Sequence, residues 1–86
     1  MARYKVLIKK SAIKELEAIP KKELPRIMEK IGALADNPRP EGSTKLSGEE
    51  KYRLRQGKYR ILYAIEDDIL TVYVVKAAQR KDVYRR

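Results

Sequence analysis

Residues 52–63 read Tyr52-Arg53-Leu54-Arg55-Gln56-Gly57-Lys58-Tyr59-Arg60-Ile61-Leu62-Tyr63. Charged and apolar side chains alternate on both sides of the Gly57-Lys58 pair, and a period of two is typical of β-strands. Arg53 and Arg55 therefore share one face of the first strand, and Arg60 follows on the next strand. Because the planar guanidinium fork fits phosphate, this pattern predicts a sheet face that binds a polyanion.

The flanking sequence predicts two more strands. An acidic turn at residues 66–68 leads to a third strand at 69–76, which is nearly continuous in Ile, Leu, Val, Thr and Tyr. Such a run suits a central strand buried on both faces. At the other end of the chain, residues 3–9 alternate in the same way as the hairpin and predict a short first strand.

Two helices are expected between the first strand and the hairpin. Ser11 is a candidate N-cap for the first, and apolar residues at helical spacing continue until Pro20 stops it. The second should begin near Lys21 or Lys22, with Pro25 in its first turn, and end at Asn37-Pro38. Its apolar stripe consists of Leu24, Ile27, Met28, Ile31, Leu34 and Ala35.

These elements predict a single α+β domain over residues 1–86. An αα-hairpin packs on one face of a sheet made of the first strand and a three-stranded antiparallel meander at 52–56, 59–65 and 69–76. Residues 39–50 are expected to form a loop, and residues 77–86 a short polar tail.

Composition narrows the chemistry. The 86 residues include no cysteine and no histidine, which removes disulfides, thiolate metal sites and the commonest general base. No apolar run reaches membrane-spanning length and no secretory signal is evident, so we expect a soluble cytoplasmic protein without membrane contact.

The net charge of +9 is unevenly distributed. The first 50 residues carry 11 basic and 8 acidic side chains, a net of +3, whereas the last 36 carry 10 and 4, a net of +6. The excess coincides with the alternating strands. Nucleic acid is therefore the first partner to consider and an acidic protein the second, with a solvated surface as the alternative.

The order of several short segments resembles the RelE/ParE superfamily of toxins, most closely its RelE branch. The segments are the Asn37-Pro38 helix end, Lys45-Leu46-Ser47-Gly48, the hairpin sequence at 52–63, and Arg80-Lys81-Asp82-Val83-Tyr84-Arg85. The resemblance covers essentially the whole chain. It implies an RNase-like α+β fold and the toxin component of a type II toxin–antitoxin pair.

RelE-like toxins cleave messenger RNA in the ribosomal A site, so the resemblance implies an endoribonuclease that needs neither metal nor other cofactor. It also implies a cognate acidic antitoxin of RelB type, and operator DNA contacted only through the toxin–antitoxin complex. From the positive sheet face, such an antitoxin is expected to compete with RNA for the same charges.

The resemblance also assigns candidate site residues. Arg60 and Arg80 match two family arginines that bind the phosphate, and Tyr84 matches a tyrosine that stacks on a base or takes part in proton transfer. Arg53 and Arg55 occupy positions where some relatives carry lysine, and either bind flanking phosphates or are ordinary surface charges.

Two lysines complete the candidate set. Lys58, in the hairpin turn, and Lys51, just before the first strand of the hairpin, could reach RNA or remain solvated. The tyrosines at 52, 59, 63 and 73 are expected to lie mostly in the core, and the acidic turn at 66–68 is expected to be solvated.

The sequence also departs from the family pattern. Gln79 stands where several relatives carry histidine before the arginine matched by Arg80. Weak chemistry that relies on a substrate organised by the ribosome is one reading. The alternatives are a ParE-type inhibitor of DNA gyrase that cleaves nothing, and an attenuated toxin that acts mainly as an antitoxin-bound co-repressor.

Overall fold

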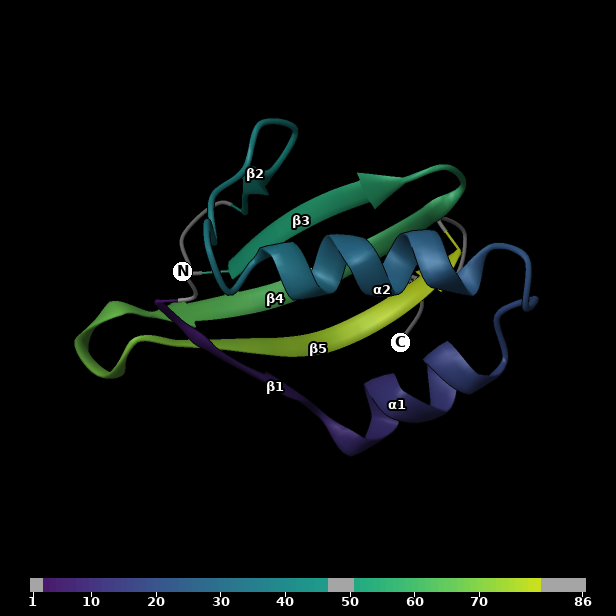
Figure 1. Cartoon of the computed structure of the whole chain (residues 1–86), viewed down its shortest axis with the longest axis horizontal. Coiled ribbons are helices and arrows are strands. Elements are labelled where there is room, and N and C mark those ends of the chain that lie inside the picture. Colours follow the sequence, from purple (N-terminus) through teal and green to yellow (C-terminus); the bar gives the residue numbers. More distant parts are fainter. Residues whose placement is uncertain (1–2, 47–50, 80–86) are drawn as a thin grey trace.

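Five strands form one sheet in the computed structural model, which describes residues 3–46 and 51–79. The elements are β1 (Lys5–Ile8), α1 (Lys10–Glu17), α2 (Leu24–Ala33), β2 (Thr44–Lys45), β3 (Lys51–Gln56), β4 (Tyr59–Glu66), the 3₁₀ turn η1 (Asp67–Ile69) and β5 (Thr71–Gln79) (Figure 1). The α+β class, with a first strand, two helices and a meander, is confirmed.

The strands lie in the order β1-β5-β4-β3-β2. The meander pairs antiparallel throughout, whereas β1 pairs parallel with β5, which is the last strand of the chain. Gly57 has a φ of +59°, a left-handed conformation that glycine adopts without the steric cost of a Cβ, and it closes the β3–β4 hairpin.

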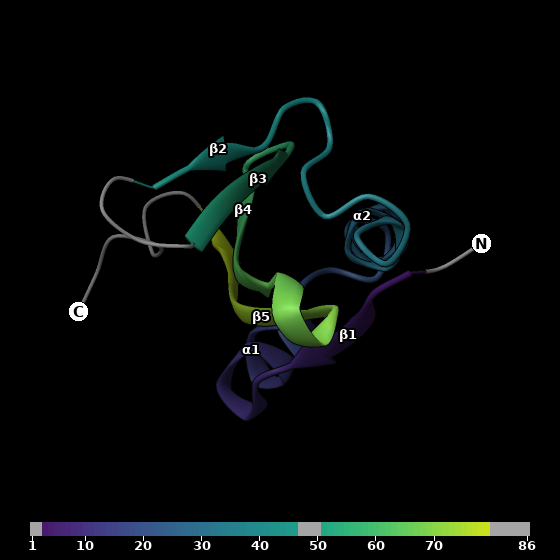
Figure 2. The same ribbon diagram turned by 90° about the vertical axis from the view of Figure 1, so that its left-hand side faces the viewer.

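Helix α2 covers one face of the sheet and α1 lies beside β5 (Figure 2), and both contribute apolar side chains to one core. Apolar side chains from α1 and α2 meet the inward side chains of β3, β4 and β5 in one buried cluster. Its fully buried large members are Ile27, Ile31, Leu34, Leu54, Ile61, Tyr63, Val72 and Val74. This cluster is the largest source of stability, because burying each aliphatic side chain contributes about 1.5–3 kcal/mol.

The helices begin differently from the sequence-based expectation. The backbone N–H of Lys9 donates to Val74 O at 2.8 Å, which keeps Lys9 attached to the sheet, and α1 starts at the next residue. Lys9 is thus the N-cap, and the prediction of Ser11 was wrong. Residues 21–23 form a turn hydrogen-bonded to Pro20 O, so α2 starts at Leu24, with Pro25 in its first turn as predicted.

The predicted third strand, 69–76, began two residues before β5 and ended three residues before its last residue, and its burial was misjudged. Ala77 and Ala78 continue β5 because they pair with Ile61 and Arg60 of β4, which outweighs the low strand propensity of alanine. Tyr73 is 41% exposed, so β5 is not buried on both faces. The central strand is β4. The rest of the predicted tail, residues 80–86, lies outside the described residues.

Within residues 3–46 and 51–79, no helix has the length and apolar character needed to cross a lipid bilayer.

Candidate nucleic-acid interface

The cations of the hairpin lie on the sheet face opposite the helices, which we call the outer face. Residues that are direct partners across neighbouring strands point to the same side of a sheet. The register therefore gives the outer face three rows that start on β3: Arg55–Arg60–Ala78, Arg53–Leu62–Lys76 and Lys51–Ala64–Tyr73. The prediction that Arg53, Arg55 and Arg60 share one face is confirmed.

Three cations follow one another along β3. Lys51, Arg53 and Arg55 are spaced two residues apart, and two strand residues rise roughly 7 Å. A cavity of about 300 Å³ lies beside Arg53 and Arg55 at the β3 edge, lined also by Lys30, Glu41, Gly42, Thr44 and Leu54. The spacing of these cations resembles that of successive phosphates in an extended single strand.

Arg60 is the one charged residue of the described chain that is buried, with 7% of its surface exposed. Its Nη1 donates to Gly57 O at 3.0 Å and to Tyr59 O at 2.9 Å, so the side chain folds back over the hairpin turn. The guanidinium group is thereby held in place by backbone that the turn itself fixes. Such a group is organised before any anion arrives.

Lys58 lies in the same turn and is exposed, with its Nζ 6.0 Å from the centroid of the Tyr59 ring. Arg80 and Tyr84 lie outside the described residues. The last described residue is Gln79, the Cα partner of Tyr59 and the neighbour of Ala78, which pairs with Arg60. The described part of β5 therefore ends beside Arg60.

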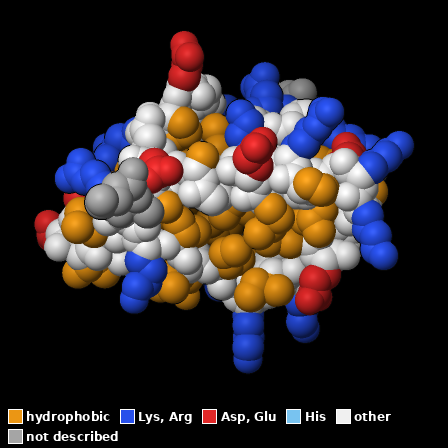
Figure 3. Space-filling model, viewed as in Figure 1, with side chains coloured by type: hydrophobic (Ala, Val, Ile, Leu, Met, Phe, Trp, Pro, Cys, Tyr) orange, Lys and Arg blue, Asp and Glu red, His pale blue; other side chains and the backbone are white. Residues whose placement is uncertain are grey.

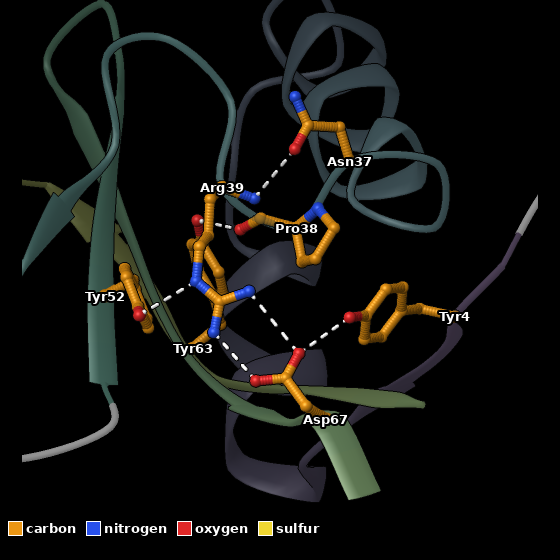
Figure 4. Close-up of polar contacts among 7 residues, drawn as sticks. All are labelled: Tyr4, Asn37, Pro38, Arg39, Tyr52, Tyr63 and Asp67. Atoms are coloured by element: carbon orange, nitrogen blue, oxygen red, sulfur yellow. Dashed lines mark hydrogen bonds and ion pairs between the residues drawn. The ribbon is translucent and has the colours of Figure 1, made fainter. Parts of the chain in front are cut away.

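A second polar cluster, absent from the sequence-based prediction, joins the loop after α2 to the β4–β5 turn (Figure 4). Arg39 donates to both carboxylate oxygens of Asp67, with an Nη2–Oδ2 distance of 2.9 Å, and its Nε donates to the Tyr52 hydroxyl at 3.0 Å. Tyr4 donates to Asp67 at 2.6 Å and Tyr63 donates to Pro38 O at 2.8 Å. The acidic turn is exposed at all three residues, as predicted, and the hydrogen bonds of Asp67 were not predicted.

The cluster shifts the pKa of its members in linked directions. Hydrogen bonds from Arg39 and then from Tyr4 lower the pKa of Asp67, and the bond to Asp67 raises the pKa of Tyr4. Hydrogen bonding to Asp67 and Tyr52 raises the pKa of Arg39. The hydrogen bonds and the ion pair of this cluster connect distant segments of the chain, which indicates a structural role.

The remaining tyrosines separate by sheet face. Tyr52, Tyr59 and Tyr63 are buried in the core as predicted, and the Tyr52 and Tyr63 rings stack with centroids 5.8 Å apart. Tyr73, on the outer face, is not, and that prediction was wrong. No group of three or more acidic residues within the described ranges is arranged to hold a metal ion.

The arrangement on the outer face suits one chemical task. Several guanidinium groups on one rigid surface neutralise the charge of a phosphodiester and of the pentacoordinate phosphorane formed when it reacts. Guanidinium keeps its proton at ordinary pH, so these residues act as charge stabilisers and donors, and proton removal needs another group.

Comparison with known proteins places this geometry in a family. A family model described as the ParE toxin of the type II toxin–antitoxin system parDE matches residues 6–84. Toxin RelG of Mycobacterium tuberculosis is 32% identical over 96% of this chain and 98% of its own length. A putative toxin RelE1 of Methanocaldococcus jannaschii is 31% identical over 96% of this chain and 97% of its own length.

The fold is equally similar. The crystal structure of the toxin–antitoxin complex RelBE2 from Mycobacterium tuberculosis contains a chain that superposes with a TM-score of 0.79 and 29% identity, over 95% of this chain and 97% of that one.

Proposed function

Since this chain belongs to the ParE toxin family of type II toxin–antitoxin systems, and to its RelE branch, we propose that it is a ribosome-dependent endoribonuclease that cleaves translated mRNA. The observation that carries the proposal is the pairing of Arg55 with Arg60 on the outer face, beside Arg53 and Lys51. Like charges in direct register cost stability, and a phosphate ligand offsets that cost.

The proposed reaction is attack by a ribose 2′-OH on the adjacent phosphorus. The 2′-oxygen forms a bond to phosphorus and the bond from phosphorus to the 5′-oxygen breaks, which leaves a 2′,3′-cyclic phosphate and a 5′-hydroxyl. One proton leaves the 2′-oxygen and one is delivered to the departing 5′-oxygen. The step needs charge stabilisation and proton transfer, and no redox change.

Each candidate residue has a part in this proposal. Arg60, preorganised on the hairpin turn, stabilises the phosphorane together with Arg80. Arg53 and Arg55 bind flanking phosphates, and Lys51 and Lys58 extend the cationic surface. Tyr84 stacks on a base or transfers a proton. The roles of Arg80 and Tyr84 rest on the family resemblance.

The chain offers few bases, and substrate positioning supplies much of the rate in this proposal. Holding the 2′-oxygen, phosphorus and 5′-oxygen in line lowers the barrier without any further catalytic group. The ribosome can impose this alignment on the message that it holds. We therefore propose that the protein cleaves messages bound to the ribosome.

The helix-bearing face supplies the second half of the proposal. Apolar side chains gather there, with lysines and arginines around them (Figure 3). Ile13 on α1 and Met28 on α2 are 42% and 40% exposed. Because the similar RelBE2 structure is a toxin–antitoxin complex, we propose that a RelB-like antitoxin binds this chain. In this proposal the antitoxin buries the apolar side chains of the helix-bearing face and places acidic residues against the lysines and arginines around them.

The proposal is tested by adding purified protein to a translation reaction and mapping the ends of the message. New 5′-hydroxyl ends within translated codons, and their loss when the antitoxin is added, support it. Intact messages on ribosomes that continue to translate contradict it.

The ParE description of the matching family model favours a second candidate, a toxin that inhibits DNA gyrase by binding. In that case a supercoiling assay shows inhibition while messages stay intact, and Arg55→Gln leaves the inhibition unchanged.

A further inference from the structure

Tyr73 differs from the other described tyrosines of the sheet. Tyr52, Tyr59 and Tyr63 are buried on the helix-bearing side, and their hydroxyls make hydrogen bonds within the protein. Tyr73 lies on the outer face and is 41% exposed, in the middle of a strand with neighbours on both sides. An exposed aromatic ring on a rigid strand is positioned to stack against a planar group of a ligand.

The neighbours of Tyr73 indicate what that is. Its row runs from the cation Lys51 on β3, across Ala64 on β4, to Tyr73, and continues to Leu7 on β1, which is 45% exposed. Lys51 and Tyr73 are two strand spacings apart, roughly 10 Å. Ala64, being small, leaves the ring face accessible between them.

This combination matches the two parts of a nucleotide. Proteins that bind single strands pair a cationic track for the phosphates with aromatic rings on which bases stack. Here β3 provides the track and β5 provides the ring, at a separation comparable to the length of one nucleotide. In the next row Thr71 pairs with Glu66 on one side and with Lys5 on the other, so this row carries one charge of each sign.

We propose that Tyr73 is a stacking platform for a base of the single-stranded message that lies away from the cleaved linkage, with Leu7 extending its apolar edge. The inference rests on the proposed function and deepens it by adding a binding contact on β5. Since the ring is remote from the buried Arg60, it binds substrate and transition state alike, so its loss raises KM and leaves kcat unchanged.

The first test uses the absence of tryptophan from the sequence. Tyr73→Trp introduces a single reporter, and stacking on a base quenches indole fluorescence. We expect quenching by a single-stranded RNA of about ten nucleotides, a length within the range covered by one small binding domain. An oligonucleotide with the same backbone but abasic at every position should bind without quenching.

The second test separates stacking from charge. Tyr73→Ala should weaken binding of the same RNA about tenfold, and Tyr73→Phe should stay within about twofold of the parent, because the ring provides the contact. The slope of log affinity against log salt should be the same in all three, since no phosphate contact is lost. Ile69→Ala, an exposed apolar change in η1, is the matched control and should leave RNA binding unchanged.

The outcomes are distinct. Cleavage and RNA binding by Tyr73→Ala equal to those of the parent, with no quenching in Tyr73→Trp, overturn the platform and leave the proposed function standing. A parent that neither binds nor cleaves RNA overturns both. If Tyr73→Ala weakens antitoxin binding but not RNA binding, the ring belongs to a protein interface and the inference is wrong. A melting temperature unchanged in Tyr73→Ala excludes misfolding as the cause of any loss.

Discussion

Arg55 on β3 and Arg60 on β4 are direct partners across the hairpin, so two guanidinium side chains leave the sheet on the same side. Opposed like charges destabilise a pair of strands by a few tenths of a kcal/mol to about 1 kcal/mol. Arg60 reduces the repulsion by folding back onto two backbone carbonyls of the turn. The pair therefore places two positive charges side by side on the outer face.

Replacing Arg55 with glutamine should stabilise the protein and weaken RNA binding. Relief of the repulsion should raise the melting temperature by about 1–8 °C, given that 1 kcal/mol corresponds to about 4–8 °C in a domain of this size. The salt slope of RNA binding should fall by about 0.7, the value for one phosphate contact on a single strand.

Arg26→Gln on α2 is the matched control for Arg55→Gln. It removes the same charge from an exposed position on the helix-bearing side, so long-range attraction drops equally while the outer face stays intact. Equal losses of RNA affinity in the two variants would show that net charge, and not the outer face, attracts RNA.

Arg60 should be needed for both fold and activity. Arg60→Met removes two hydrogen bonds from a charged donor and should cost about 2 kcal/mol of unfolding free energy, measured by urea titration. Arg60→Lys keeps the charge but not the planar fork, so it should recover part of the stability and little of the cleavage. Full cleavage by Arg60→Lys would contradict a role for the guanidinium geometry.

The hydrogen bond of the buried Tyr63 hydroxyl should contribute to the free energy of unfolding. It donates to Pro38 O at 2.8 Å, where the chain leaves the helical layer. Tyr63→Phe leaves that buried carbonyl without this donor, and should cost about 1–3 kcal/mol in urea unfolding while leaving RNA binding unchanged. An unchanged midpoint would contradict a stabilising role for this hydrogen bond.

Stability should depend on acid through Asp67. Its pKa is lower in the folded protein, mainly because of the hydrogen bonds from Arg39, so the carboxylate adds stability at pH values above its ordinary 3.8. That contribution disappears as pH falls through the depressed folded value. Asp67→Asn should therefore melt below the parent at neutral pH, and the two curves should converge in strong acid.

Tyr4→Phe provides the control for the acid experiment. It removes the second hydrogen bond to Asp67 and keeps Arg39, so the gap between its melting temperature and that of the parent should be smaller than the gap for Asp67→Asn. A parallel offset at every pH in Asp67→Asn would contradict a role for the charge.

The hairpin could be derived from the sequence because its information is local. Alternation on both sides of Gly57 sets the strands, and the short turn sets the register that brings Arg55 opposite Arg60. The apolar face of α2 could also be predicted, since its apolar residues recur at helical spacing over three turns.

The features that were missed depend on contacts between distant residues. Arg39 meets Asp67 across 28 residues of chain, and no periodic pattern reports such an ion pair. The extension of β5 through Ala77 and Ala78 depends on the partner strand β4, and local propensity argues against it. Tyr73 was assigned to the core because its neighbours are apolar, although alternation along β5 places it on the face opposite to that of Val72 and Val74.

The central claim is that the cations of the outer face act on RNA, and the most direct measurement is the fraction of message cut per ribosome. Parent, Arg55→Gln and Arg26→Gln are compared at equal concentration in one translation reaction. The account predicts cut ends at the same codons in parent and Arg26→Gln, and a loss of at least about tenfold in Arg55→Gln, the factor that corresponds to about 1.4 kcal/mol of lost transition-state binding. Equal cutting by all three proteins, or no cutting by any, would contradict it.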